Sequence, residues 1–194
     1  MQSILTKSKN NFGDEDLLIE ISKVHPKQFE VLYNKYHEPI FRFVYQRMET
    51  KESAAGITSQ VFLKAIVHLK NYVSRGIPFS SWLYRIALNE VNSYYSRSKQ
   101  HRVINIETTK AHELIDEMET DKTDEQLSRM YNSLTLLCDD DLHLLEMRFF
   151  ESRPFKEIAD ILNISENNAK VRLYRVIDKL KQLIGIQHSK KNSL

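Results

Sequence analysis

The chain has 194 residues, 28% of them charged and 41% hydrophobic, with a formal net charge of +2, a composition that indicates a soluble globular protein rather than a disordered or membrane protein. No apolar run approaches the length of a membrane span and no signal-peptide pattern opens the sequence, so a cytoplasmic protein without membrane insertion is expected. The single cysteine, Cys138, excludes an internal disulfide and a CxxC metal site, and only four Gly and four Pro predict long helices and an all-α fold.

Three helices are predicted in the first third of the chain. The first begins at Asp14, a suitable N-cap, and its pattern breaks before Pro26. The second follows apolar residues at three- and four-residue spacing in 29–48, where Pro39 predicts a kink or a break in the preceding turn. The third has the same period and runs from roughly Ser53 to Leu69.

A loop from Asn71 to Phe79 leads into a helix with two different faces, in the stretch SWLYRIALNEVNSYYSRSKQHR. Its apolar stripe consists of Leu83, Ile86, Ala87, Val91 and Tyr94, and its polar face of Arg85, Asn89, Asn92 and Ser96. Amides hydrogen-bond to base edges and arginine binds phosphate, which suits nucleic acid. An ordinary hydrated helix face has the same composition, so this helix alone leaves both interpretations open.

Charge is distributed unevenly along the chain. Residues 64–102 contain seven Lys and Arg but one acid, Glu90, whereas residues 107–125 contain eight acids and two Lys. Two basic modules on either side of an acidic stretch suggest a polyanion that is contacted at two places, although most charge runs are simply solvated faces. Because residues 103–125 also lack a sustained helical period, a flexible acidic linker is predicted there.

The C-terminal part carries a helix-turn-helix pattern. Helical spacing resumes at Leu127, and Asp139 to Asp141 are placed to cap the helix that follows. A short helix begins near Pro154 and ends at Asn163, a residue that tolerates the left-handed conformation of a helix end. Ser165 then caps a longer helix, which completes the helix-turn-helix arrangement.

The second helix of this motif has a packing stripe and a hydrogen-bonding face. The stripe comprises Ala169, Leu173, Val176, Ile177, Leu180 and Ile184. The other face comprises Asn167, Asn168, Lys170, Val171, Tyr174 and Arg175, with Arg172 and Lys179 beside it. Amides, a small apolar side chain and long cations are the groups that contact bases and phosphates from the major groove. The alternative is a surface helix whose basic residues are incidental.

Two parts of the chain resemble one known family, in that family's own order. EIADILNISENNAKVRLYRVIDKLK closely resembles region 4, the C-terminal promoter-reading domain, of the extracytoplasmic-function (ECF) class of sigma-70 factors, with Ala169 where the family often has Val. DEDLLIEISKVHPKQFEVLYNKYHEPIF resembles the opening of region 2, and FSSWLYRIALNEVNSYYSR resembles its later helix. In that helix Ser93 stands where Asp is frequent, and the matching residues are Phe79, Trp82, Leu83, Ile86, Ala87, Asn89 and Arg97.

The resemblance implies two small helical domains with assigned roles. Tails at 1–13 and 186–194 flank a region 2-like domain at 14–102, the acidic linker at 103–125 and a region 4-like helix-turn-helix domain at 126–185. Region 4 is expected to bind the minus-35 element in the major groove through Asn167, Asn168, Lys170, Val171, Arg172, Tyr174 and Arg175. Region 2 is expected to hold and help melt the minus-10 element through Tyr72, Arg75, Tyr84, Arg85, Asn89, Asn92 and Arg97.

The implied partners are core RNA polymerase and promoter DNA, and the resemblance also allows an anti-sigma factor; no cofactor, metal or small-molecule substrate is expected. Polymerase docking is assigned to Ile57, Gln60, Val61 and Lys64 on the third helix. The family commonly has A-E-D-L-x-Q-E-x-F there, whereas residues 54–62 of this chain are AAGITSQVF. Loss of those acids weakens complementarity to a basic polymerase surface, and Gly56 lowers helix stability by about 1 kcal/mol relative to Ala.

Two rival interpretations accompany the sigma-factor prediction. A helix-turn-helix regulator that works without polymerase would bind its operator alone as a homodimer. A divergent sigma-like protein would bind polymerase weakly or occupy an anti-sigma factor without starting transcription. An enzyme is not expected, because the seven His are scattered and no HExxH motif, glycine-rich phosphate loop or nucleophile spacing occurs.

Overall fold

The structure of the chain, a computed structural model, describes residues 13–74, 76–98, 104, 108–118 and 123–185. Regular structure in these ranges is entirely helical, which confirms the predicted all-α fold. The helices are α1 (Asp14–Val24), η1 (Pro26–Gln28), α2 (Phe29–Tyr45), α3 (Lys51–His68), η2 (Leu69–Asn71), α4 (Phe79–Ser98), α5 (Thr108–Glu117), α6 (Asp124–Leu134), α7 (Asp139–Leu145), η3 (Glu146–Phe150), α8 (Phe155–Leu162) and α9 (Glu166–Ile184). Among these helices, none is both long and apolar enough to cross a membrane. The predicted tails, apart from Gly13, lie outside the described residues.

The N-terminal helices pack as a small bundle in which α2, α3 and α4 contact one another. Leu32, Val61 and Leu83, one from each helix, are fully buried in the shared core. Of the kink or break that Pro39 predicts near His37, the break does not occur: α2 continues through this point as one helix. Pro39 and Lys35, whose carbonyl loses its usual hydrogen-bond donor, both lie on the exposed side of α2, so water can satisfy that carbonyl.

The C-terminal helix-turn-helix follows its local sequence signals. Asn163 ends α8 in the left-handed conformation with φ of 56°, as predicted from the tolerance of Asn for that region. The Ser165 hydroxyl accepts a hydrogen bond from the Asn168 backbone N–H at 3.2 Å and caps α9. The predicted packing stripe of α9 is buried, from Ala169 to Ile184. These features fix the angle at which α9 leaves α8.

The stretch predicted to be a flexible linker partly forms a helix. α5 occupies Thr108–Glu117, and its side chains Ala111, Leu114 and Ile115, with Met118 just beyond it, are at most 1% exposed. α5 packs against η3 and α6 of the C-terminal part. The prediction of flexibility is therefore wrong for residues 108–118, where apolar side chains at helical spacing bury one face and the acids occupy the other.

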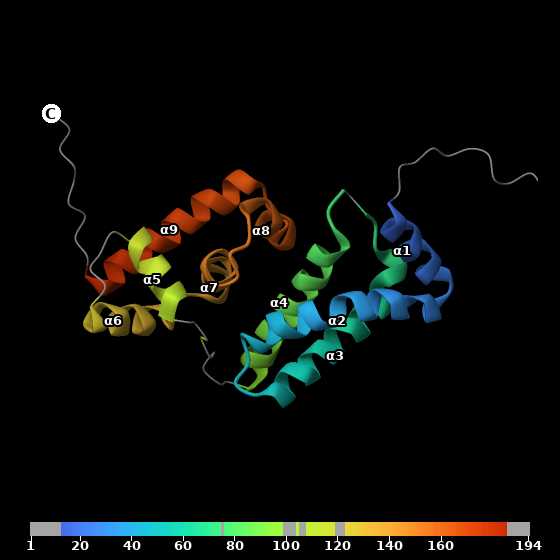
Figure 1. Ribbon diagram of the computed structural model, residues 1–194, viewed down its shortest axis with the longest axis horizontal. Helices are drawn as coiled ribbons and strands as arrows, with labels where there is room; N and C mark the ends of the chain where they lie inside the picture. The colour runs from blue at the N-terminus through green and yellow to red at the C-terminus, as the bar shows by residue number, and fades with distance from the viewer. Residues whose placement is uncertain (1–12, 75, 99–103, 105–107, 119–122, 186–194) are drawn as a thin grey trace, which may run out of the picture.

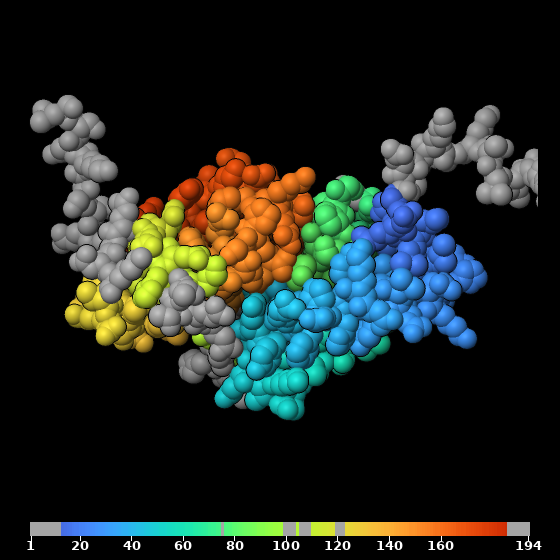
Figure 2. Space-filling model, viewed as in Figure 1, coloured from blue at the N-terminus to red at the C-terminus, as the bar shows by residue number. Residues whose placement is uncertain are grey.

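Two halves of the molecule lie against each other. Figure 1 shows the N-terminal half, defined as α1–α4, beside the C-terminal half, defined as α5–α9. Helices α4 and α8 make the contact, and the buried apolar side chains of the two halves belong to one continuous cluster. The space-filling view shows the orange surface of the C-terminal half touching the green and blue surface of the N-terminal half (Figure 2). The helical domains predicted from sequence thus form a closed pair.

Candidate nucleic-acid interface

The face of α9 opposite its packing stripe is open to solvent. Of the predicted minus-35 residues, Asn167, Asn168, Val171, Tyr174 and Arg175 are exposed, and Lys170 and Arg172 are half-buried. Tyr174 keeps 54% of its surface exposed and Val171 keeps 41%, high fractions for large apolar side chains. The structure thus brings this whole predicted set together on one helix. Amide, apolar and cationic groups of this kind contact base edges in the major groove.

Two cations beside this face pair with the acidic start of α7. Arg172 lies 3.8 Å from the Asp140 carboxylate, and the Lys179 ammonium lies 3.2 Å from that of Asp141. Exposed ion pairs of this kind contribute roughly 0–1 kcal/mol, so a phosphate can replace the carboxylate at little cost. The prediction that Asp139 to Asp141 cap α7 is wrong, because Cys138 occupies the N-cap position and makes no side-chain capping bond. The three acids lie in the first turn, where their charge favours the positive end of the helix dipole.

The sequence did not indicate one cluster near α9, in which Arg148 and Lys170 lie around the ring of Phe155. The Arg148 guanidinium and the Lys170 ammonium lie 4.9 and 5.6 Å from the centre of the Phe155 ring. Lys170 also pairs with Glu166 at 2.7 Å, one turn earlier on α9. Arg148 lies in η3, far from α9 in sequence, and no local pattern links it to Phe155. Phe155 therefore holds two cations at the side of the exposed face.

The polar face of α4 points in two directions. Asn89 and Arg97 are exposed, and Arg97 donates to the Ser93 carbonyl on its own helix. Arg85 instead donates from Nε to the Ile161 carbonyl at 2.9 Å and from Nη2 to the Asp160 carbonyl at 2.7 Å. Burial lowers the pKa of the Arg85 guanidinium and the Asp160 charge opposes that shift, but arginine stays protonated at neutral pH. Asn92 likewise faces the C-terminal half.

The two tyrosines of the predicted minus-10 set, Tyr72 and Tyr84, are buried in this arrangement. Tyr72 packs edge-on against Phe79 and tilted against Trp82, with ring centres 5.2 and 4.8 Å away. Burial raises the pKa of the Tyr72 hydroxyl. Tyr84 lies under the Arg153 guanidinium, 4.0 Å from its ring centre. Arg75, the remaining residue of this predicted set, lies outside the described residues.

The predicted polymerase contacts on α3 divide between surface and core. Ile57 is 8% exposed and Val61 is fully buried, so these two belong to the packing side of the helix. Gln60 and Lys64 are exposed, and the Lys64 ammonium pairs with the Glu90 carboxylate at 2.5 Å. The apolar period of α3 already includes Ile57 and Val61, and only the family resemblance assigned them to docking, so that assignment is wrong for these two. Beside Gln60 and Lys64, the exposed side carries Ala55, Gly56, Ser59, Leu63 and Val67.

Family models match both halves of the chain. Residues 32–101 match Sigma-70 region 2, and residues 140–180 match Sigma-70, region 4. The first match covers most of α2 and all of α3 and α4, and the second covers α7 through most of α9. The two matches occur in the order that the sequence motifs predicted.

Individual relatives agree with these matches. The chain is 27% identical over 163 residues to the ECF RNA polymerase sigma factor BldN of Streptomyces coelicolor, a match that covers 80% of this chain and 60% of BldN. It is 27% identical over 155 residues to the RNA polymerase sigma factor SigZ of Bacillus subtilis, covering 80% and 86%. CnrH, solved in complex with the cytosolic domain of CnrY, has a similar fold, with a TM-score of 0.54, 17% identity and coverage of 89% and 97%.

Proposed function

Because the chain belongs to the sigma-70 family of RNA polymerase sigma factors, in the ECF class, we propose that it binds core RNA polymerase and directs transcription from specific promoters. It acts as an initiation factor, not as a catalyst, and works in the cytoplasm. Its partners are core polymerase and promoter DNA, with an anti-sigma factor as a further partner on the strength of the family alone.

The minus-35 element is bound by α9, and the observation that carries this proposal is the exposed face of that helix. Val171, Tyr174 and Arg175 project from a capped helix whose opposite side is anchored in the core. A rigidly held helix with such side chains fits the major groove, where Arg contacts guanine edges and a small apolar group meets thymine methyl groups. Arg172 and Lys179, at the edges, exchange their carboxylate partners for phosphates.

The minus-10 element is held by α4 and the loop before it. Unstacking a base costs a few kcal/mol, which aromatic stacking and phosphate contacts on the single strand offset. Asn89 and Arg97 are available on the α4 surface, and Arg85, Asn92 and Tyr84 join them once the C-terminal half no longer covers them. Tyr72 would in addition have to leave the rings of Phe79 and Trp82 in its own half. Arg75 completes the proposed set.

Transcription in vitro with core polymerase tests the proposal, and substitutions on the exposed face of α9 give the most specific test. Arg175→Ala removes a base contact worth about 1–3 kcal/mol, so run-off product from a cognate promoter is expected to fall about 5- to 150-fold. Gln182→Ala, at an exposed site near the end of the same helix, serves as control and should leave product unchanged. If core enzyme never starts at any promoter with this chain, the sigma-factor function fails; operator binding without core enzyme would instead favour an independent regulator.

Core polymerase docks on the exposed side of α3 through Gln60 and Lys64. The lack of carboxylates at positions 55, 56 and 60, where the family commonly has acids, favours weak docking. Ala55→Glu combined with Gly56→Asp adds two acids at exposed positions, and a Cβ added at 56 meets no atom within 4 Å beyond the nearby backbone of its own helix. Each added acid should tighten polymerase binding by about 0.2–1 kcal/mol, less at high salt. Affinity measured by fluorescence titration checks this.

A neutral pair of the same shape, Ala55→Gln with Gly56→Asn, is the matched control for that experiment. It shares the removal of the helix-softening glycine, so any gain common to both variants reflects helix stability rather than charge. Equal affinities for the acidic and neutral pairs would contradict electrostatic docking at this side of α3.

A further inference from the structure

One side of α2 carries a row of aromatic rings that none of the proposed DNA contacts includes. This aromatic row consists of Tyr33, His37, Phe41 and Tyr45, which follow one another at intervals of four residues and so lie along one side of the helix. Successive ring centres are 5.0, 6.3 and 5.9 Å apart, and the last two pairs of rings are nearly parallel, at 11° and 5°. The row therefore extends without a gap along most of α2.

A ring of α3 shows which side of α2 the aromatic row occupies. The centre of the Phe62 ring lies 4.8 Å from that of Tyr33 and 6.0 Å from that of His37. Helices α2 and α3 run side by side in Figure 1. The aromatic row thus lies on the side of α2 that is next to α3, and Phe62 links it to the surface of that second helix.

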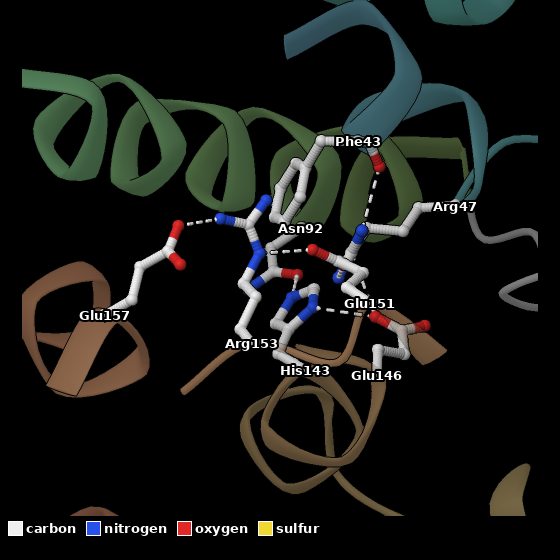
Figure 3. Close-up of polar contacts among 8 residues, drawn as sticks. All are labelled: Phe43, Arg47, Asn92, His143, Glu146, Glu151, Arg153 and Glu157. Atoms are coloured by element: carbon white, nitrogen blue, oxygen red, sulfur yellow. Dashed lines mark hydrogen bonds and ion pairs between the residues drawn. The ribbon is translucent and has the colours of Figure 1, made fainter. Parts of the chain in front are cut away.

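Charged contacts hold the end of α2 in place. Figure 3 shows Arg47, just beyond α2, between the carboxylates of Glu146 and Glu151 of the C-terminal half. Nε lies 2.9 Å from the Glu146 carboxylate and Nη2 lies 2.5 Å from that of Glu151. Arg47 is 1% exposed, and its Nη1 also donates to the Phe43 carbonyl of α2 at 2.8 Å. Because α2 is fixed at its end and packed along α3, the aromatic row is a preformed surface that a partner can bind without ordering it first.

The aromatic row is open to solvent at both ends. Tyr33 and Tyr45 keep 38% and 46% of their surface exposed, and the two rings between them are half-buried. On α3, Leu63 follows Phe62 in sequence and is 55% exposed. Single exposed apolar side chains are common on protein surfaces, but a connected group of them marks an interaction site.

The charges on α2 beside the row suit a cationic partner and do not suit nucleic acid. Glu30 and Glu38 stand three residues before Tyr33 and Phe41, so they are neighbours of these rings on the helix surface. Arg42 is paired with Glu38 at 2.7 Å, which offsets its charge. The faces of aromatic rings attract guanidinium and ammonium groups, whereas carboxylates repel phosphates.

More acids follow the end of the row. Glu49 and Glu52 are exposed where the chain leaves α2 and enters the first turn of α3, with Lys51 between them. Acids therefore outnumber cations along and just beyond the row, with Glu30, Glu38, Glu49 and Glu52 against Arg42 and Lys51. A protein surface that carries arginine and lysine is complementary to this combination of ring faces and carboxylates.

We propose that the polymerase-docking surface extends from α3 onto α2, where the aromatic row binds arginine and lysine side chains of core RNA polymerase. This inference rests on the proposed function and assigns docking to residues of α2 for the first time. The ring faces supply attraction for cations that α3 lacks without acids at positions 55, 56 and 60. Docking thus relies on aromatic side chains of one helix as much as on the polar side chains of the other.

Leucine substitutions in the row test the proposal on the full chain. Phe41→Leu combined with Tyr45→Leu keeps apolar side chains but removes two ring faces, so affinity for core polymerase should fall about 5- to 30-fold. Fluorescence titration of the labelled chain with core enzyme measures this loss. The matched control is Phe41→Tyr combined with Tyr45→Phe, which exchanges the two rings, keeps both faces and should bind within about twofold of the native chain.

An affinity that the leucine variant retains overturns the proposal, as does an equal loss in the control. The row belongs instead to nucleic acid if the leucine variant loses only binding to fluorescein-labelled single-stranded DNA, and to a second copy of the chain if it abolishes a native dimer seen by scattering. Should circular dichroism show that the double variant is unfolded, Tyr45→Leu alone decides, with an expected loss of about 2- to 5-fold.

The two proposals fail in different ways in this experiment. A native chain that binds core enzyme and starts transcription, beside a leucine variant of native affinity, defeats only the docking on α2. A native chain that never binds core enzyme defeats the proposed function, and the docking on α2 with it.

Discussion

Leu114→Ala is expected to destabilise the C-terminal half strongly, although Leu114 lies within a stretch whose composition suggests a linker. Its side chain is fully buried where α5 packs on η3 and α6. Removing a buried leucine side chain costs about 2–5 kcal/mol, from lost burial and from the cavity that remains. Urea unfolding followed by circular dichroism should show that loss as a lower midpoint for the transition of the C-terminal half.

The control for this experiment is another leucine in the same half. Leu136 is 65% exposed, so Leu136→Ala should change the free energy of unfolding by less than about 0.5 kcal/mol. A flexible linker would make the two variants alike. If Leu114→Ala costs no more than Leu136→Ala, α5 is not a structural part of the C-terminal half.

The features that the sequence predicted well are determined within a few residues. Asn163 and Ser165 specify the turn between α8 and α9 through their own backbone and side-chain preferences, and both have the predicted conformation and cap. The stripe of α9 is visible because its apolar residues recur over about four turns. Such local signals also separated the exposed minus-35 set from the core.

The sequence did not predict α5, because its apolar period is short and lies within a strongly acidic stretch. Ala111, Leu114, Ile115 and Met118 have the spacing of one helix face, but they cover only two turns among many acids. A helix of about ten residues is marginal without tertiary contacts. Its stability comes from packing on the next helix, α6, and on η3, which follows two helices later in the chain.

The contact between the halves was beyond sequence reasoning for a different physical reason. Arg47 and Glu151 are separated by 104 positions, and neither lies in a motif. Side chains that suit DNA, such as Arg85 and Asn92, also suit backbone carbonyls and a buried imidazole. Chemistry therefore indicated the polar face of α4, whereas only the fold shows what occupies it.

Arg47→Met is expected to open the chain rather than unfold it. Methionine keeps an apolar stem against Phe43, but it leaves the Glu146 and Glu151 carboxylates without the cation between them. Breaking a buried pair costs about 3–5 kcal/mol while the site stays shut, which lowers the ratio of closed to open chain by roughly a hundredfold to a few thousandfold. Separation of the two halves hydrates both carboxylates, so the open chain avoids most of the free energy that the closed chain loses without Arg47.

The pattern of rescue distinguishes opening from a folding defect. Arg42→Met, at an exposed position of α2 shortly before Arg47, should leave scattering and thermal stability as in the native chain. Glu151 keeps Arg153 as a partner at 2.5 Å, so Glu146→Gln alone is added to Arg47→Met. This change removes the buried carboxylate charge that Arg47 pairs at 2.9 Å, and the radius of gyration should return toward the native value. An Arg47→Met chain that stays compact, or a double variant that stays as open as the single one, would contradict a central place of the Arg47 ion pairs and would leave apolar area to hold the halves together.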